Sequence, residues 1–167
     1  MVPNLPVSRP VLWWLYAAAC LTFAATLGLP YLGGEGVYNI TSLEMEGSGE
    51  FFVTTIYGTS YGRPPLLNWL VVPLADLLGW DRVLAASRVV TAGATVATGL
   101  VLAWLASGLS WDHTFGAFTA VAFLTGDALF YRGWLAYSDS LFTLCVFGAI
   151  ACQWVGVHER RPALARL

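Results

Sequence analysis

The segment that decides the fold is PLLNWLVVPLADLLG, residues 65–79. Most of its side chains are apolar, so its composition suits a membrane span. A helix over residues 65–79 reaches only about 22 Å at 1.5 Å per residue, less than the hydrocarbon core of about 30 Å. Pro73 lies inside the segment, and Asn68 and Asp76 add polar groups. We therefore predict a juxtamembrane helix over residues 65–79 that dips into the interface without crossing.

The rest of the chain has the composition of a membrane protein. Hydrophobic residues make up 57% and charged residues 11% of the 167 positions, whereas a soluble domain carries about 25% charged residues. The first apolar run has no clear small-x-small cleavage site before Pro30, which favours an uncleaved span over a signal peptide. The long apolar runs predict four transmembrane helices, at about residues 11–29, 85–109, 114–134 and 140–157.

A polar outer loop, residues 30–84, separates the first two predicted spans. Val37, Ile40 and Leu43 recur at helical spacing, which predicts a second juxtamembrane helix over residues 37–46 that Gly47 ends. The predicted fold class is an all-α integral membrane protein. It forms a single module over residues 1–167.

The topology follows from whether residues 65–79 cross. If they stay at the interface, Glu35, Arg63 and Asp139 all lie on the outer side of the membrane. Both termini are then cytoplasmic. The arginines near the two ends of the chain, among them Arg9, agree with the positive-inside rule, although no basic residue lies in the 110–113 turn.

Two residues of the outer loop are candidates for chemistry. Glu35 lies among the glycines of residues 33–36, so a substrate could approach its carboxylate closely and use it as a general base. The alternative is a solvated loop acid. Arg63 precedes Pro64 and Pro65, which hold it extended, and could bind a phosphate bidentately. The alternative is an arginine at the level of the lipid headgroups.

Further charged residues lie at or near the ends of the predicted spans. Asp139 begins the last span, where an acid is also favoured by the helix dipole alone. Arg88 either snorkels or binds a phosphate. Arg132 is expected to pair with Asp127. Glu44, with the other acids of residues 44–50, is interpreted as part of a solvated face.

Several classes of site are not indicated. The three cysteines lie inside predicted spans without metal-type spacing, so we expect neither disulfides nor a cysteine metal site. The chain has no basic patch for nucleic acid. No cofactor is indicated, although an outer acidic pair could hold a divalent metal ion.

The order of the loop motifs resembles the N-terminal part of membrane glycosyltransferases of the GT-C fold. The branch that it is most similar to includes the lipid A aminoarabinose transferase and protein mannosyltransferases. The matching stretches are Glu35 to Tyr38, Glu44-Met45, Ser48 to Phe51, and Tyr61 to Leu66 with Trp69. Residues 85–88 and the stretch from Arg132 to Asp139 also look familial, so the resemblance covers nearly the whole chain.

This resemblance implies an inverting sugar transfer from a polyprenyl-phosphate donor. The acceptor, a lipid, glycan or protein, would bind on the outer face. The resemblance assigns catalytic roles to Glu35 and Asp139. We expect three arginines to bind the donor phosphate and two tyrosines to contact substrate; these are Arg63, Arg88 and Arg132, and Tyr38 and Tyr61.

The chain departs from the family pattern at Gly34, where the first acid of a pair is expected, at Val37, where an arginine is expected, and at Gly62. Three alternatives follow for the missing acid: Glu35 takes its role, another group does, or this member is inactive. Family members are also much longer, so we expect an N-terminal fragment or one chain of a split protein. The rival hypothesis is a non-catalytic membrane module that binds lipid phosphate or a partner subunit.

Overall fold

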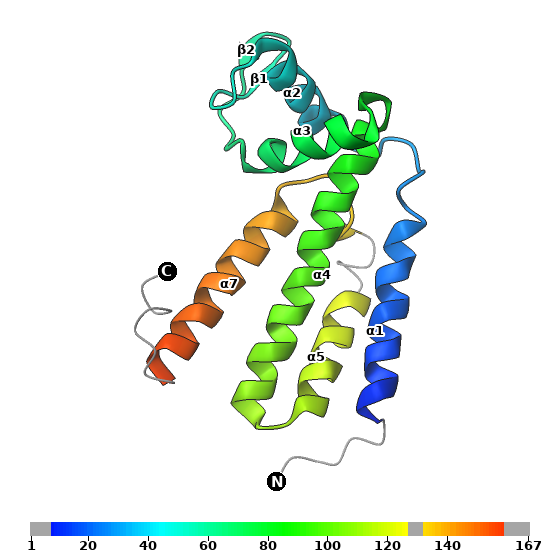
Figure 1. The fold of residues 1–167 in the computed structure, drawn as a ribbon, viewed down its shortest axis with the longest axis vertical. Helices are drawn as coiled ribbons and strands as arrows, with labels where there is room; N and C mark the ends of the chain where they lie inside the picture. The colour runs from blue at the N-terminus through cyan, green and yellow to red at the C-terminus, as the bar shows by residue number, and fades with distance from the viewer. Residues whose placement is uncertain (1–7, 127–131, 159–167) are drawn as a thin grey trace.

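The computed structural model describes residues 8–126 and 132–158, and these are mostly helical. Four helices run lengthwise in Figure 1, with two further helices and a short hairpin gathered at one end. The lengthwise helices are α1 (Arg9–Ala24), α4 (Val83–Ser110), α5 (His113–Thr125) and α7 (Asp139–His158). The end group, here called the cap, holds α2 (Glu35–Ser48), β1 (Thr55–Ile56), β2 (Thr59–Ser60) and α3 (Leu66–Leu78).

Helix α4 organises the packing of the chain. It contacts α5, α7 and, at its N-terminal end, the cap helices α2 and α3, while α1 packs against α5. Tyr16 and Phe23 of α1 join Leu124 of α5 and Trp134 in a buried apolar cluster. The Tyr16 hydroxyl also donates to the Val96 carbonyl oxygen at 2.5 Å, which satisfies a buried polar group and ties α1 to α4.

Small residues let α4 and α5 approach closely. A Cβ on Gly116 of α5 would lie 1.9 Å from Ser107 Oγ and 2.4 Å from the Ala103 carbonyl oxygen, both on α4. Such contacts are impossible without movement of the α4 backbone. Glycine at position 116 is therefore required by the distance between the two helices, as is common where helices pack in lipid.

Two helical segments of the described chain, Trp80–Ser110 and Asp139–Val157, are long and apolar enough to cross a membrane. They correspond to two of the four predicted spans. Helices α1, with 16 residues, and α5, with 13, are shorter than the predicted spans 11–29 and 114–134. Length and composition therefore support membrane association, and the four-span arrangement remains a prediction.

The cap differs from its prediction in detail. Helix α2 begins at Glu35 and ends at Ser48, beyond the predicted stop at Gly47, because Gly49 takes the left-handed conformation (φ 72°) and its N–H caps the Met45 carbonyl. Helix α3 matches the predicted helix at 65–79 closely and lies in the cap rather than alongside the long helices (Figure 1). The antiparallel hairpin of β1 and β2 was not predicted, because strands of two residues carry no periodic signal.

Replacing Gly116 by alanine tests the close approach of α4 and α5. We expect the Gly116→Ala variant to lose about 1–3 kcal/mol of stability, because the added methyl group overpacks the contact. Gly148→Ala in α7 is the matched control, since no atom lies within 4 Å of a Cβ there. It should be neutral or gain about 0.5–1 kcal/mol from helix propensity. Denaturant unfolding in detergent measures both, and equal stabilities would contradict the packing.

Candidate functional site

A buried ion pair joins the cap to the long helices. Glu35 and Arg88 are both fully buried, and Arg88 Nη2 lies 2.6 Å from Glu35 Oε2 while Arg88 Nε donates to Glu35 Oε1 at 2.9 Å. The backbone N–H groups of Leu32 and Ala136 also donate hydrogen bonds to the carboxylate, each at 2.9 Å. The acceptor positions of Glu35 are thus filled from three separate parts of the chain.

The Arg88 guanidinium is satisfied as fully as the carboxylate. Nη1 donates to the carbonyl oxygens of Thr26 and Leu29, each at 2.7 Å, and Nη2 also donates to that of Pro30 at 2.8 Å. Together with the two bonds to Glu35, these use all five N–H donors of an arginine. The Trp134 ring lies 5.0 Å from the guanidinium carbon, in a cation–π contact. No donor of Arg88 remains for a phosphate.

The environment of Glu35 keeps it ionised. Burial acts to raise the pKa of this carboxyl, but the hydrogen bonds from Arg88, Ala136 and Leu32 outweigh burial and hold its pKa below the ordinary value. A charged carboxylate that is buried and fully hydrogen-bonded is well suited to fix the structure. It is poorly placed to take a proton from a substrate.

These contacts correct two expectations. The glycines around Glu35 were expected to open it to a substrate, but they allow the chain to turn its carboxylate inward. Tyr137 occupies the space at Gly34: its hydroxyl accepts from the Gly34 N–H at 2.8 Å, and a Cβ there would lie 3.4 Å from its ring. A Cβ at position 34 would therefore be in ordinary van der Waals contact with this ring. Arg88, expected to bind a donor phosphate, instead neutralises Glu35.

Arg63 is held in a different way, by aromatic side chains. Its guanidinium carbon lies 5.5 Å from the Tyr38 ring centroid and 5.2 Å from that of Tyr61, and Nη1 donates to the Tyr38 hydroxyl. Among the described residues, no carboxylate pairs with Arg63. Its positive charge therefore remains available to an anion. This arrangement brings together three of the predicted site residues.

Asp139 lies close to the same group. It lines a cavity of about 360 Å³ together with Arg63, Tyr38 and Tyr61, and a second, more polar one that also includes Tyr137. Leu66, Phe142 and other apolar side chains form one wall of the larger cavity. Asp139 is exposed and, within the described ranges, forms no ion pair. The site thus combines a free carboxylate, a cation without a carboxylate partner and an apolar wall.

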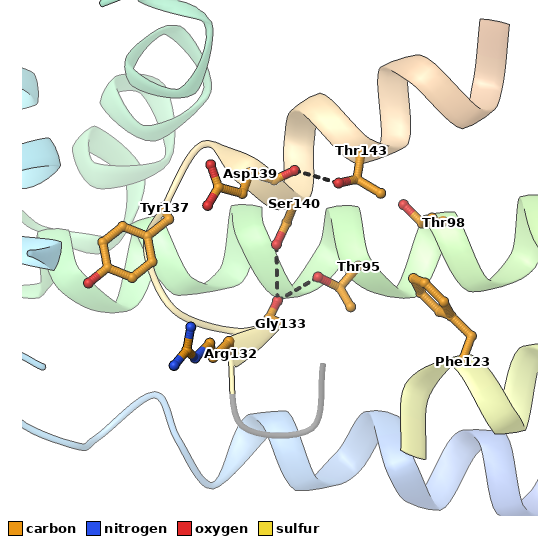
Figure 2. Close-up of a pocket in the computed structure, with 9 residues that line it drawn as sticks. All are labelled: Thr95, Thr98, Phe123, Arg132, Gly133, Tyr137, Asp139, Ser140 and Thr143. Atoms are coloured by element: carbon orange, nitrogen blue, oxygen red, sulfur yellow. Dashed lines mark hydrogen bonds between the residues drawn. The ribbon is translucent and has the colours of Figure 1, made fainter. Parts of the chain in front are cut away.

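Arg132 shares a different cavity with Asp139. Both line a cavity of about 210 Å³ whose floor carries hydroxyl groups of α4 and α7 (Figure 2). The Gly133 carbonyl oxygen accepts there from Thr95 Oγ1 at 2.5 Å and from Ser140 Oγ at 3.4 Å. The pairing predicted between Arg132 and Asp127 lies outside the described residues. Asp139 therefore lines the cavities that it shares with Arg63 and also a different cavity that it shares with Arg132.

The hairpin of the cap positions Arg63 through backbone contacts. Thr54 Oγ1 donates to the Arg63 carbonyl at 2.9 Å, and the Tyr61 N–H donates to the Thr54 carbonyl at 2.8 Å. Glu44 holds the turn: it accepts from Thr55 Oγ1 and the Tyr57 N–H, each at 2.5 Å. These bonds lower the pKa of the Glu44 carboxyl, and the bond from Thr55 has the largest effect. Glu44 is partly exposed, in keeping with the predicted solvated face, and it also holds the turn, which was not predicted.

Sequence reasoning also missed a row of buried polar side chains on α4. Ser87, Arg88, Thr91, Thr95 and Thr98 are all buried and recur at spacings of three and four, on one helix face. Thr91 Oγ1 donates to the Trp134 carbonyl at 3.1 Å, and Thr95 bonds Gly133, so the row holds the segment that leads to Asp139. The helical period of these hydroxyls was the signal that could have revealed it.

Metal ligands are not grouped in the part of the chain that the structure describes: no three His, Cys, Asp or Glu side chains there could hold an ion together. Comparison of the chain with protein-family models, with curated proteins and with solved structures gives no significant match. The case for a function therefore depends on the geometry of the site and on the resemblance of its motifs.

Removing one partner of the buried pair should destabilise the fold strongly. We expect Glu35→Gln to cost about 3–5 kcal/mol, because it leaves the Arg88 charge buried without a counter-ion. The double variant Glu35→Met with Arg88→Met should recover part of this loss. Glu46→Gln, on the exposed face of α2, is the control. Denaturant unfolding in detergent measures all three, and a Glu35→Gln variant as stable as the control would contradict the structural role.

The same pair predicts a pH dependence of unfolding. The folded-state pKa of Glu35 is lowered, so its contribution is complete above the ordinary glutamate value of 4.5 and is lost as the pH falls through the folded-state value. The wild type should therefore lose stability below about pH 4.5. The double methionine variant should lose less over the same interval, and parallel pH profiles would contradict the assignment.

The Glu44 contacts predict local protection in the hairpin. In Glu44→Gln, amide hydrogen exchange at Tyr57 and Gly58 should be faster than in the wild type at the same pH, because the carboxylate that accepts from both N–H groups is lost. Glu46→Gln, on the same helix, should leave these amides unchanged. Unaltered exchange in Glu44→Gln would show that the turn is held by other contacts.

Proposed function

We propose that this chain is the membrane module of a GT-C-type glycosyltransferase that moves a sugar from a polyprenyl-phosphate donor to an acceptor on the outer face. The observation that carries the proposal is the shared cavity of Arg63 and Asp139. In this arrangement α1, α4, α5 and α7 lie in the bilayer, the cap faces outward, and both termini are cytoplasmic. The two segments long and apolar enough to cross a membrane support the placement of α4 and α7 in the bilayer.

The donor phosphate is assigned to Arg63. Arginine binds phosphate bidentately, and this guanidinium is oriented by aromatic rings rather than by a carboxylate, so binding an anion displaces no ion pair. The apolar wall at Leu66, Leu141 and Phe142 suits the first isoprene units of the carrier. Arg132, which lines a cavity with Asp139, is the second cation near the site. We assign to it the phosphate-binding role that was expected for Arg88.

The carboxylate is assigned to Asp139 instead of Glu35. In an inverting transfer, an acceptor hydroxyl or amine attacks the anomeric carbon from the face opposite the phosphate. The bond between that carbon and the phosphate oxygen breaks, polyprenyl phosphate leaves, and the acceptor proton passes to the carboxylate. Asp139 can take this proton because it is exposed in the cavity and has no basic partner among the described residues.

A transfer assay with paired variants tests the assignment. Asp139→Asn should lower turnover at least about 100-fold, as loss of a general base does, while binding of polyprenyl phosphate is retained. Arg63→Gln should weaken binding of polyprenyl phosphate and raise the donor KM. Asp81→Asn, an exposed acid paired only with Arg82, is the matched control. The donors to test are polyprenyl-phosphate mannose and polyprenyl-phosphate aminoarabinose, with the chain in its complete natural context.

A second candidate function has an observation in its favour. Glu35, the outer-loop acid expected to act as the base, is buried and paired with Arg88, so it is not available to a substrate. A non-catalytic module that binds a lipid phosphate, or presents it to a partner subunit, needs Arg63 and the apolar wall but not Asp139. Polyprenyl phosphate binding that depends on Arg63, with no turnover in the wild type on either donor, would decide for this module. Turnover unchanged in Asp139→Asn would overturn the catalytic role of Asp139.

A further inference from the structure

A separate cavity lies at the end of the molecule opposite the cap. Its volume is about 790 Å³, more than that of any cavity beside Asp139. Its lining residues come from the first turns of α1, from the end of α4 and the start of α5, and from the later part of α7. Figure 1 shows these segments at the end of the molecule opposite the cap. Four tryptophans and two basic side chains line it: Trp13, Trp104, Trp111, Trp154, Arg9 and His113. None of the residues assigned to sugar transfer takes part.

The chemistry of the lining is that of a membrane interface. Tryptophan gathers where hydrocarbon meets headgroups, because one edge of the ring can hydrogen-bond while the rest is apolar. Trp104 and Trp111 are among the exposed residues, and the remaining lining is mostly aliphatic or small. The two exposed rings give the cavity an apolar wall. Its apolar area suits an acyl chain better than a soluble metabolite.

The charges of the lining select the headgroup. Arg9 and His113 both line the cavity, and no acidic side chain of the described residues does. The nearest acid along the chain, Asp112, is engaged as the helix cap of α5, where its Oδ1 accepts from the Thr114 N–H at 2.7 Å. The lining therefore offers a guanidinium and an imidazole N–H and, among the described residues, no competing carboxylate. This combination is complementary to a phosphate.

We propose that this cavity binds one anionic phospholipid, with its phosphate at Arg9 and His113 and an acyl chain against the tryptophans. The volume falls within the range of sites that enclose small ligands. A free phosphate would leave the apolar wall uncovered, and a zwitterionic lipid would bring its own cation to the two basic groups. The site is independent of the proposed sugar transfer, since it lies at the other end of the long helices.

Native mass spectrometry of the full chain in detergent tests the proposal. The chain is titrated with phosphatidylglycerol and, separately, with phosphatidylcholine. We expect one phosphatidylglycerol to be retained and phosphatidylcholine to bind at least about five-fold more weakly, the effect of about one basic residue near an anionic lipid. Arg9→Gln and His113→Gln should each weaken phosphatidylglycerol retention to a similar degree. Excess inorganic phosphate should leave the lipid bound.

The matched control is Arg82→Gln, which removes the same charge near the cap, where Arg82 is paired with Asp81. It should retain phosphatidylglycerol as the wild type does. Equal retention of the two lipids, or equal loss in Arg82→Gln and Arg9→Gln, would overturn the proposal. Displacement by inorganic phosphate would also overturn it, because the anion alone would then account for binding. If Arg9→Gln does not fold, His113→Gln decides with the same readout.

Discussion

The ion pair between Glu35 and Arg88 is the constraint on which the rest of the structure depends. Two charges removed from water are tolerated only when their hydrogen bonds are complete, and here they are. The carboxylate draws its donors from the start of the cap, from α4 and from Ala136, while the guanidinium binds the carbonyls that follow α1. Tyr38 follows Glu35 by about one helical turn, and Asp139 follows Ala136 closely. The pair therefore fixes the backbone on both sides of the candidate site.

In this arrangement, one pair of charged side chains holds the fold together, and the other charged side chains are available to a ligand. Glu35 and Arg88 are buried and neutralise each other, so neither contributes a net field to the cavity. Arg63 is oriented by the faces of two tyrosines, which leave its charge uncompensated. Asp139, in the first turn of α7, lines both the cavity with Arg63 and the cavity with Arg132. The apolar wall beside them excludes water from one side and strengthens these interactions.

Sequence patterns predicted the parts of this structure that depend on composition and period. The helix at 65–79 and its place outside the long helices followed from its length and its proline. The expectation that Arg63 and Asp139 lie on the same side agrees with the cavity that both line. Patterns could not predict whether an acid acts on a substrate or holds the fold together. The glycines around Glu35 suggest a site that is open to substrate. In the fold, however, the ring of Tyr137, which follows Gly34 by 103 residues in the sequence, lies against Gly34. The role of Glu44 was hidden for the same reason, because its partners are backbone N–H groups in a hairpin that no periodicity marks.

The span of the Glu35 contacts has a consequence for how the chain matures. Its donors at positions 32, 88 and 136 are made at widely separated times during synthesis, and the last emerges 101 residues after the carboxylate. Until Arg88 is made, Glu35 lacks the counter-ion that it has in the folded chain. The bond from the Ala136 N–H can form only after a further 48 residues have been added. The hydrogen bonds of the buried carboxylate are therefore complete only when segments from both halves of the chain have assembled.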